Sequence, residues 1–331
     1  MKSLEVLSAA GKLALSRLIS EVENETSAGR TALDECFSRS GKAHLIGVTG
    51  APGTGKSSLV NRLAQLIRRE GNQTVAIVAI DPSSPFTGGA ILGDRVRMRD
   101  LSGDPGVFIR SMASRGELGG LARTTAGVVQ LLDAAGYDLI LIETVGAGQS
   151  EVDIARLAHT TIVVESPGMG DDIQAIKAGI LEIADILVVN KADRPGIENT
   201  ERALRANLEL GYSHRVTGKA GHGGFTEENK VVDAEEWVPP VIKTIATEES
   251  GFPELIKAIV EHRSYLQKTG LLAQREHERL TDEFDHILRH TLVQNWKAQT
   301  SDEHVQQIMD AVYKRKRSPA NAVEELTRTS N

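Results

Sequence analysis

The stretch GAPGTGKS at residues 50–57 constrains the fold of this chain more than any other feature. It fits the pattern G-x-x-x-x-G-K-[ST], in which backbone N–H groups and a helix N-terminus surround phosphate oxygens. An apolar run precedes the motif and a helical pattern follows it, which is the context that it requires. We expect Lys56 to reach the β- and γ-phosphates and the Ser57 hydroxyl to ligate Mg²⁺. The remaining loop residues expected to bind the nucleotide are Gly50, Ala51, Pro52, Gly53, Thr54, Gly55 and Ser58.

Short apolar runs alternate with helical patterns through the middle of the chain. Most of these runs are rich in Val and Ile with little polar alternation, which is typical of strands buried on both faces of a parallel sheet. The alternation predicts an α/β doubly wound, mostly parallel P-loop domain over residues 41–269. The expected strands are residues 43–50, 74–81, 106–111, 138–144, 160–166, 185–191 and 240–246, and the clearest helices are residues 57–70, 118–135, 171–184 and 198–210.

Helical patterns flank this domain on both sides. Residues 1–40 predict an extension of two helices, broken by the polar stretch ENETSAGR. Residues 270–331 predict charged helices, the last of which begins at Pro319. An apolar stripe on a charged helix needs a partner surface, and periodicity alone leaves open whether this is the chain's own sheet or a second copy. Residues 211–234 predict a long polar loop.

Composition excludes several classes of function. The 331 residues carry a formal net charge of −7, which gives no electrostatic reason to expect nucleic acid as a partner. Cys36 is the single cysteine, so an internal disulfide or a cysteine-rich metal site cannot form. No apolar run approaches the roughly 18 residues of a membrane span, and the N-terminus lacks the pattern of a signal peptide. We expect a cytoplasmic protein without a membrane partner.

The sequence NKAD at residues 190–193 predicts which base is bound. The Asp193 carboxylate accepts hydrogen bonds only, so it can pair with the N1–H and N2–H₂ donors of guanine. Adenine leaves those acceptors unsatisfied, which can discriminate between the bases by orders of magnitude. Lys191 is expected to lie along the base and Asn190 to tie this turn to the phosphate loop. Ala246, after the seventh run, is expected to offer its backbone N–H to the guanine carbonyl. We therefore expect GTP rather than ATP.

Acidic residues at strand ends predict the surroundings of the metal ion. Asp81 ends the second run and Glu143 stands at the tip of the fourth, where carboxylates can hold Mg²⁺ directly or through water. Asp94 is a third candidate. Gly146, in the E-x-x-G of residues 143–146, can turn its N–H onto the γ-phosphate. Gln149 is a candidate for orienting the attacking water.

A glycine-containing segment at residues 165–179, ESPGMGDDIQAIKAG, predicts a further helix. Gln174 and Lys177 stand one turn apart on one face of it and could act in hydrolysis as a movable switch. From the residues alone, an ordinary helix is the favoured interpretation.

The motifs DPSSPFTGGAILGDRVRM, RGELGGLARTT, YDLILIETVGAGQSE and GDDIQAIKAG…ADILVVNKAD resemble those of one family. It comprises the GTPase chaperones of adenosylcobalamin-dependent acyl-CoA mutases, the MeaB/ArgK-type proteins related to the human methylmalonic aciduria type A protein. The resemblance covers residues 40–270, and the flanking helices match only in character. It implies a homodimer built through a C-terminal arm, which favours that role for residues 270–331.

The same resemblance implies a function. The family uses GTP and Mg²⁺ to gate cofactor loading into a mutase, commonly methylmalonyl-CoA mutase, and to protect it. Cobalamin belongs to the mutase and is not expected on this chain. Lys56 and Ser57 match the family's phosphate and Mg²⁺ positions, and the matching acidic positions around Mg²⁺ are Asp81, Asp94 and Glu143. Gln174 and Lys177 match the third switch, which responds to the mutase.

One departure leaves the partner open. Some members read GGGD-[ED]-LQGIKKG where this chain reads PGMGDDIQAIKAG, so Ala178 replaces a second lysine. The partner is then methylmalonyl-CoA mutase or a related isobutyryl- or hydroxyacyl-CoA mutase. Competing interpretations are a GTPase that matures nickel enzymes, a transport-associated accessory kinase and a metabolic kinase. The sequence has no Cys–His cluster for the first interpretation and no membrane segment or kinase loop for the second. The NKAD sequence argues against the third.

Overall fold

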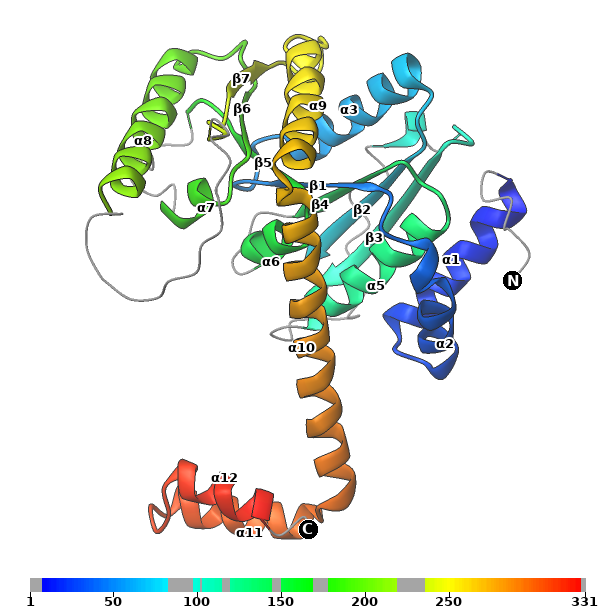
Figure 1. The fold of residues 1–331 in the computed structure, drawn as a ribbon, viewed down its shortest axis with the longest axis vertical. Coiled ribbons are helices and arrows are strands. Elements are labelled where there is room, and N and C mark those ends of the chain that lie inside the picture. The colour runs from blue at the N-terminus through cyan, green and yellow to red at the C-terminus, as the bar shows by residue number, and fades with distance from the viewer. Residues whose placement is uncertain are drawn as a thin grey trace. The chain divides into compact units, whose positions relative to one another are not determined.

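The computed structural model describes residues 8–82, 98–101, 103–114, 120–144, 150–168, 178–218 and 236–328. The chain divides into two compact units, Met1–Arg279 and Leu280–Asn331, and each has an apolar core of its own. Figure 1 shows the elements of both. Among the described residues, no helix combines the length and the apolar character needed to cross a bilayer.

The described part of the first unit is built on a seven-stranded sheet in the order β3-β2-β4-β1-β5-β6-β7 (Figure 1). Every neighbouring pair is parallel, so the predicted doubly wound sheet is confirmed and is parallel throughout. All seven strands fall on the predicted apolar runs. Their bounds are β1 His44–Thr49, β2 Val75–Pro82, β3 Val107–Ser114, β4 Leu139–Thr144, β5 Thr160–Glu165, β6 Ile186–Asn190 and β7 Val241–Thr244.

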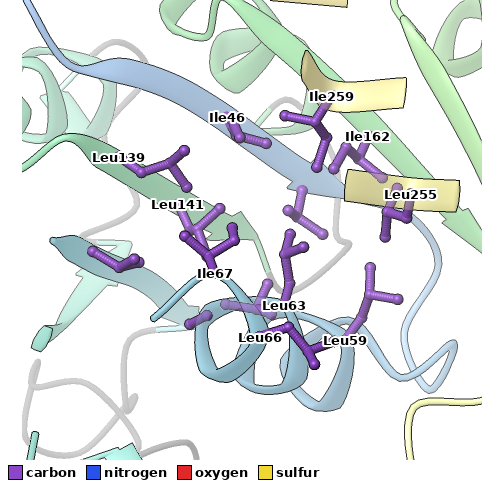
Figure 2. Packing of buried hydrophobic residues seen from close by; sticks show 14 of the residues in the cluster. Ile46, Leu59, Leu63, Leu66, Ile67, Leu139, Leu141, Ile162, Leu255 and Ile259 are labelled. Carbon is purple, nitrogen blue, oxygen red and sulfur yellow. The ribbon is translucent and has the colours of Figure 1, made fainter. Parts of the chain in front are cut away.

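Helices cover both faces of this sheet, which explains why the central strands are apolar on both sides. On one face, α3 (Lys56–Gly71) and α9 (Phe252–Thr269) pack against alternate strand residues. Figure 2 shows Leu63 and Ile67 of α3 on the side of Leu141 of β4, with Leu255 and Ile259 of α9 beside Ile162. The opposite face carries α1 (Ala9–Glu23), α2 (Ser27–Cys36), α5 (Gly120–Ala134), α6 (Ser150–Leu157), α7 (Ala178–Glu182) and α8 (Ile197–Gly218).

The two predicted N-terminal helices are confirmed as α1 and α2, but the break between them is shorter than predicted, because α2 begins at Ser27. Ser8 and Thr26 cap them, each accepting a hydrogen bond from the backbone N–H three residues on. Leu15 and Ile19 of α1 are fully buried in the core of the opposite face. The ammonium of Lys12 donates to the carbonyls of Asp104 and Val107 at 2.8 and 2.6 Å, which fixes α1 to the edge of the sheet beside β3.

Two short 3-10 turns and one longer helix complete the connections. The turns are η1 (Phe37–Arg39) and η2 (Arg99–Leu101). The prediction of a loop from residue 211 onward was wrong for its first part, because residues 211–218 continue α8. A helix tolerates a glycine such as Gly211 at a cost of about 1 kcal/mol, and this glycine does not end α8. Residues 219–235 lie outside the described part of the chain.

A buried polar chain crosses the edge of the sheet where β1, β5 and β6 begin. His44 Nε2 and His262 Nδ1 lie 2.8 and 2.9 Å from the Thr160 hydroxyl, and His262 Nε2 lies 3.2 Å from Asp185 Oδ1. An ionised carboxylate only accepts, so the proton sits on Nε2 of His262. In the neutral ring, Nδ1 then accepts from Thr160, whose hydroxyl in turn accepts from His44. The order of Thr, His and Asp resembles a hydrolytic triad, but Thr160 and His262 are 0 and 1 % exposed, so no substrate reaches them.

Asp185 connects this series of buried polar side chains to the start of α10. It accepts hydrogen bonds from the Thr161 backbone at 2.8 Å and from two nitrogens of Arg275 at 2.9 and 2.8 Å. Burial alone would raise the pKa of the Asp185 carboxyl, but the hydrogen bonds from His262 and Arg275 outweigh it and hold that pKa at about 2. The backbone carbonyl of Asp185 also accepts from the indole N–H of Trp237 at 2.8 Å.

The second unit consists of the end of α10 (Leu271–Gln299) with α11 (Asp302–Tyr313) and α12 (Pro319–Arg328). The last of these begins at Pro319, as predicted. Ile308, Ala322 and Leu326 form its small core, against which Trp296 packs. The Trp296 indole N–H donates to the Leu326 carbonyl at 3.1 Å, which satisfies the polar atom of a half-buried ring.

Candidate nucleotide-binding site

The loop at residues 50–57 lies at the carboxyl end of β1, between β4 and β5. This is the position where ligands bind in open parallel sheets, because the connections from neighbouring strands diverge there. Gly50 has a φ of +138°, and a Cβ on it would lie 2.1 Å from the Val164 carbonyl oxygen of β5. Gly55 has a φ of +94°, and a Cβ there would lie 2.4 Å from Nδ2 of Asn190. Close contacts with the ends of β5 and β6 therefore require glycine at these two positions.

The loop presents an open helix N-terminus together with a buried lysine. Gly55 precedes α3 and caps it without a side-chain hydrogen bond, so the N–H groups of Ser57 and Ser58 in the first turn of α3 can bind an anion. The Lys56 ammonium donates to the carbonyls of Gly50 and Ala51 at 2.8 and 3.0 Å and is held inside the loop. Thr54 closes the loop by donating its hydroxyl to Ala51 at 3.0 Å. Pro52, Gly53 and Ser58 are exposed around this interior.

Ser57 and Glu143 meet at the end of β4. The Ser57 hydroxyl donates to Glu143 Oε1 at 2.6 Å, and Glu143 is only 4 % exposed. Because the hydroxyl proton points to the carboxylate, the oxygen lone pairs of Ser57 remain available as a metal ligand. This pair suits Mg²⁺, which takes one or two protein oxygens together with phosphate oxygens and water. The described residues contain no group of three or more His, Cys, Asp or Glu that could hold a metal by itself.

The other predicted switch residues lie partly or wholly outside the described chain. Asp81 belongs to β2, one residue beyond Ile80, which pairs with Thr144 of β4. Its backbone therefore ends beside the strand that carries Glu143, whereas its side chain is not described. The remaining predicted residues, Asp94, Gly146, Gln149, Gln174 and Lys177, lie outside the described residues.

The NKAD turn is tied to the phosphate loop by two side chains. Asn190 is 1 % exposed, donates its amide to the Thr54 carbonyl at 2.9 Å and accepts from the Thr244 hydroxyl at 3.2 Å. Lys191 adopts a left-handed backbone with a φ of +60°, and its ammonium donates to the Gly53 carbonyl. Asp193 is exposed beyond them, and its carboxylate makes no hydrogen bond or ion pair within the part of the chain that the structure describes.

A second turn, after β7, lies against the helix that follows the phosphate loop. The Ala192 N–H donates to the Thr244 carbonyl at 3.1 Å, which joins the NKAD turn to the end of β7. The Ala246 carbonyl accepts from Arg62 Nε of α3 at 3.2 Å. Glu249 in the same turn pairs with Arg62 at 2.9 Å. Sequence reasoning singled out Ala246 but missed Arg62, Thr244 and Glu249, whose partners lie far away along the chain.

The structure thus brings the predicted residues with described side chains to one edge of the sheet. The phosphate-binding groups lie at the end of β1, and the hydrogen-bonded pair of Ser57 and Glu143 lies at the end of β4. The two turns on the side of the base follow β6 and β7. This arrangement can hold a nucleoside polyphosphate along the ends of the strands, with its base toward Asp193 and Ala246.

Comparison with known proteins gives the family. The family model described as methylmalonyl-CoA mutase-associated GTPase MeaB matches residues 15–301. The chain belongs to this family. It is 43 % identical over 299 residues to a Pyrococcus horikoshii protein described as a GTPase, covering 90 % of this chain and 89 % of that one. It is 32 % identical over 244 residues to the mitochondrial methylmalonic aciduria type A homolog of Caenorhabditis elegans, covering 74 % and 57 %.

A solved structure supports the same assignment. The crystal structure of a LAO/AO transport system kinase superimposes with a TM-score of 0.68 at 26 % identity, covering 99 % of this chain and 96 % of that one. The protein is accordingly a P-loop GTPase that binds guanine nucleotide and hydrolyses GTP.

Proposed function

We propose that this MeaB-family GTPase is a chaperone of an adenosylcobalamin-dependent acyl-CoA mutase. The proposal rests on the family match over residues 15–301, because the family is described by its association with methylmalonyl-CoA mutase. Methylmalonyl-CoA mutase is the first partner to test, and a related acyl-CoA mutase is the second. GTP binding and hydrolysis gate the loading of adenosylcobalamin into the mutase and protect the loaded enzyme. The cobalamin stays on the mutase, and both proteins work in the cytoplasm.

The site residues have separate roles in this proposal. Lys56 and the amides of the loop at residues 50–57 hold the β- and γ-phosphates, and Lys56 neutralises charge that develops during hydrolysis. Ser57 would ligate Mg²⁺, and Glu143, with Asp81 and Asp94, would hold the ion's water ligands. The bound ion would supply positive charge that offsets the negative charge of the phosphates. Gly146 donates its N–H to the γ-phosphate.

The base is recognised by the two turns beside β6 and β7. Asp193 accepts from N1–H and N2–H₂ of guanine, and Lys191 lies along the ring plane. Asn190 keeps this turn against the phosphate loop through its bond to Thr54 at 2.9 Å. The N–H of Ala246 donates to the guanine carbonyl O6.

The third switch connects hydrolysis to the mutase. Gln174 and Lys177 change position when the mutase binds and then act on the attacking water or the γ-phosphate. Intrinsic hydrolysis in P-loop GTPases can be slow until a partner completes the site, often by factors of about 10³–10⁵. We therefore expect a slow basal rate of GTP hydrolysis that rises when the mutase binds.

We also propose that the C-terminal arm pairs two copies of the chain. Phe284, Leu288 and Leu292 recur every four residues on α10, and each is 43 % or more exposed. Side chains at this spacing form one stripe of a helix, and an exposed apolar stripe needs a partner surface. Replacing Leu288 by Glu should convert a dimer into a monomer in multi-angle light scattering, whereas Arg289→Glu beside it should not. A wild-type monomer at micromolar concentration would contradict the pairing.

Stimulation of hydrolysis by purified mutase tests the proposed function. We expect methylmalonyl-CoA mutase to raise the GTP turnover of the wild-type chain at least tenfold, in line with partner-completed sites. Gln174→Ala and Lys177→Ala should keep the basal rate and lose the stimulation. Lys257→Ala, on the exposed side of α9, serves as the control and should be stimulated like the wild type. If mutase neither binds the chain nor alters its turnover with any nucleotide, the chaperone proposal fails. Activation by a nickel enzyme instead would support the competing interpretation.

A further inference from the structure

The turn that follows β7 is rigid through its own hydrogen bonds. Ile245 and Ser250 form an antiparallel bridge in which the Ile245 N–H donates to Ser250 at 3.0 Å. The Glu248 N–H closes the turn by donating to the Ile245 carbonyl at 3.0 Å. Gly251 ends it with a φ of +77°, and a Cβ there would lie 1.8 Å from the Lys243 carbonyl oxygen. The turn is therefore internally rigid, and its position relative to the sheet depends on its contacts with neighbouring elements.

Two arginines of α3 hold this turn from one side. Arg62 and Arg69 stand two helical turns apart and so lie on the same face of α3. Both bind the Glu249 carboxylate, at 2.9 and 3.0 Å. Only Arg62 also reaches the backbone, donating its Nε–H to the Ala246 carbonyl at 3.2 Å. Arg62 thus contacts the turn at two points, whereas Arg69 contacts the turn only at Glu249 and also pairs with Glu70 of its own helix.

Glu249 makes this contact from an unfavourable backbone conformation. Its φ is +60°, a left-handed conformation that a side chain such as glutamate rarely adopts. The hydrogen bond from Arg69, followed by the charges of Arg69 and Arg62, lowers the pKa of Glu249, so the carboxylate stays ionised between the two arginines. This conformation places the carboxylate within hydrogen-bond distance of both arginines of α3.

Ala246 is the residue whose orientation Arg62 fixes. Its methyl group packs against the core beneath α3 and α9, and its carbonyl is bound by Arg62. Its N–H makes no hydrogen bond with any residue that the structure describes. A backbone donor is therefore left available in this turn. The end of β7 that leads into the turn is joined to the NKAD segment, because the Ala192 N–H donates to the Thr244 carbonyl at 3.1 Å.

We propose that Arg62 is a positioning residue for base recognition, holding the Ala246 N–H where it meets the carbonyl O6 of guanine. This rests on the proposed roles of Ala246 and Asp193 in reading the base. Because Arg62 extends from the helix that begins at the phosphate loop, it ties the base-reading turn to the phosphate site. The Arg62–Glu249 ion pair is partly exposed to solvent, so the pair itself contributes little to affinity. The gain comes from presenting the N–H in its bound position before the nucleotide arrives.

Nucleotide analogues separate this role from a general structural one. Inosine diphosphate keeps O6 and lacks the 2-amino group, whereas 2-aminopurine riboside diphosphate keeps the 2-amino group and lacks O6. Arg62→Met retains the length of the side chain and removes its donors. Arg69→Met is the matched control, because it removes an arginine from the same face and the same carboxylate without touching Ala246. Dissociation constants would be measured for GDP and both analogues on the full chain, with thermal melting to confirm folding.

We expect Arg62→Met to weaken GDP and inosine diphosphate about tenfold each, or about 1.4 kcal/mol, and to change the 2-aminopurine analogue less than about twofold. Arg69→Met should change all three by less than about twofold. Equal losses for all three nucleotides in Arg62→Met, or an unchanged affinity for GDP, would overturn the positioning role.

The Asp193→Asn variant keeps the two proposals distinguishable. An amide donates where the carboxylate accepts, so this variant should lose GDP and gain xanthosine diphosphate, whose 2-position is a carbonyl. If it retains its preference for GDP, the assignment of the base site is wrong. If it switches while Arg62→Met weakens all three nucleotides equally, only the role of Arg62 is refuted.

Discussion

The buried His44 should make the first unit sensitive to mild acid. His44 is 2 % exposed, and its Nε2 lies 2.8 Å from the Thr160 hydroxyl. Burial, then repulsion from Arg263, His159 and His262, lowers the pKa of His44 from 6.5 to about 2, against a smaller opposing effect of Asp185. His44 therefore stays neutral in the folded state at a pH below 6.5, where the same histidine takes up a proton in the unfolded chain.

The size of the effect follows from linkage. A depressed folded pKa gives stability that is present above the unfolded pKa and lost as pH falls toward the folded one. Between pH 7.5 and pH 5, uptake of one proton by the unfolded chain costs the folded state about 2 kcal/mol. This figure depends on the ordinary histidine pKa and not on the exact folded value, provided that the latter lies well below 5.

The test compares urea unfolding of the parent and His44→Gln at both pH values. The glutamine amide can replace the Nε2–H donor to Thr160 without carrying a titratable proton. A Trp296→Phe background makes fluorescence report on Trp237, whose ring lies 4.8 Å from His262 in the same polar chain.

We expect the parent to lose about 2 kcal/mol more than His44→Gln between the two pH values. His286→Gln, at an exposed position of α10, should behave like the parent. Equal losses in the parent and in His44→Gln would refute the reasoning, because the remaining histidines are common to both proteins.

Three further predictions concern the nucleotide site. Lys56→Ala should lower GTP turnover by about 10²–10³-fold through lost charge stabilisation, with Lys257→Ala unchanged; normal turnover in phosphate-release assays would contradict the assignment. Glu143→Gln keeps an acceptor for Ser57 but removes the negative charge, so the Mg²⁺ concentration for half-maximal turnover should rise about 10-fold or more. An unchanged Mg²⁺ titration would argue against a role for Glu143 in holding the ion. Gly50→Ala should be more destabilising in thermal unfolding than Gly41→Ala, since both have positive φ but only Gly50 meets a carbonyl within 2.1 Å; similar losses would show that the contact with Val164 relaxes.

The parts of the fold that sequence predicts are those whose signal is local. The strands of the sheet are buried on both faces, so they read as continuous Val- and Ile-rich runs whose ends fall within a few residues of those observed. The loop at residues 50–57 is equally local, because its glycines, Lys56 and Ser57 are contiguous. The end of α8 was not predicted, because the polar and glycine-containing residues after 210 carry no apolar period.

Contacts between distant segments could not be predicted from one sequence. His44, Asp185 and Arg275 converge only because β1, β5 and β6 begin at the same edge of the sheet. Arg62 reads as an ordinary charged residue on an amphipathic helix, and its partner Glu249 lies 187 positions away. Two arginines at heptad spacing beside a phosphate loop were the available signal, and without knowledge of the strand order they could not be paired with the turn after β7.

We propose that the nucleotide state of this chain controls a mutase, and the transfer of adenosylcobalamin to that mutase tests this proposal. The rate at which purified apo-methylmalonyl-CoA mutase acquires adenosylcobalamin would be followed by its absorbance, with the chain present and GTP, GDP or a non-hydrolysable GTP analogue supplied. We expect loading to proceed with GTP and to be arrested or slowed at least tenfold with the analogue, and we expect Lys56→Ala to abolish this difference. Loading at one rate under all three nucleotides would contradict it.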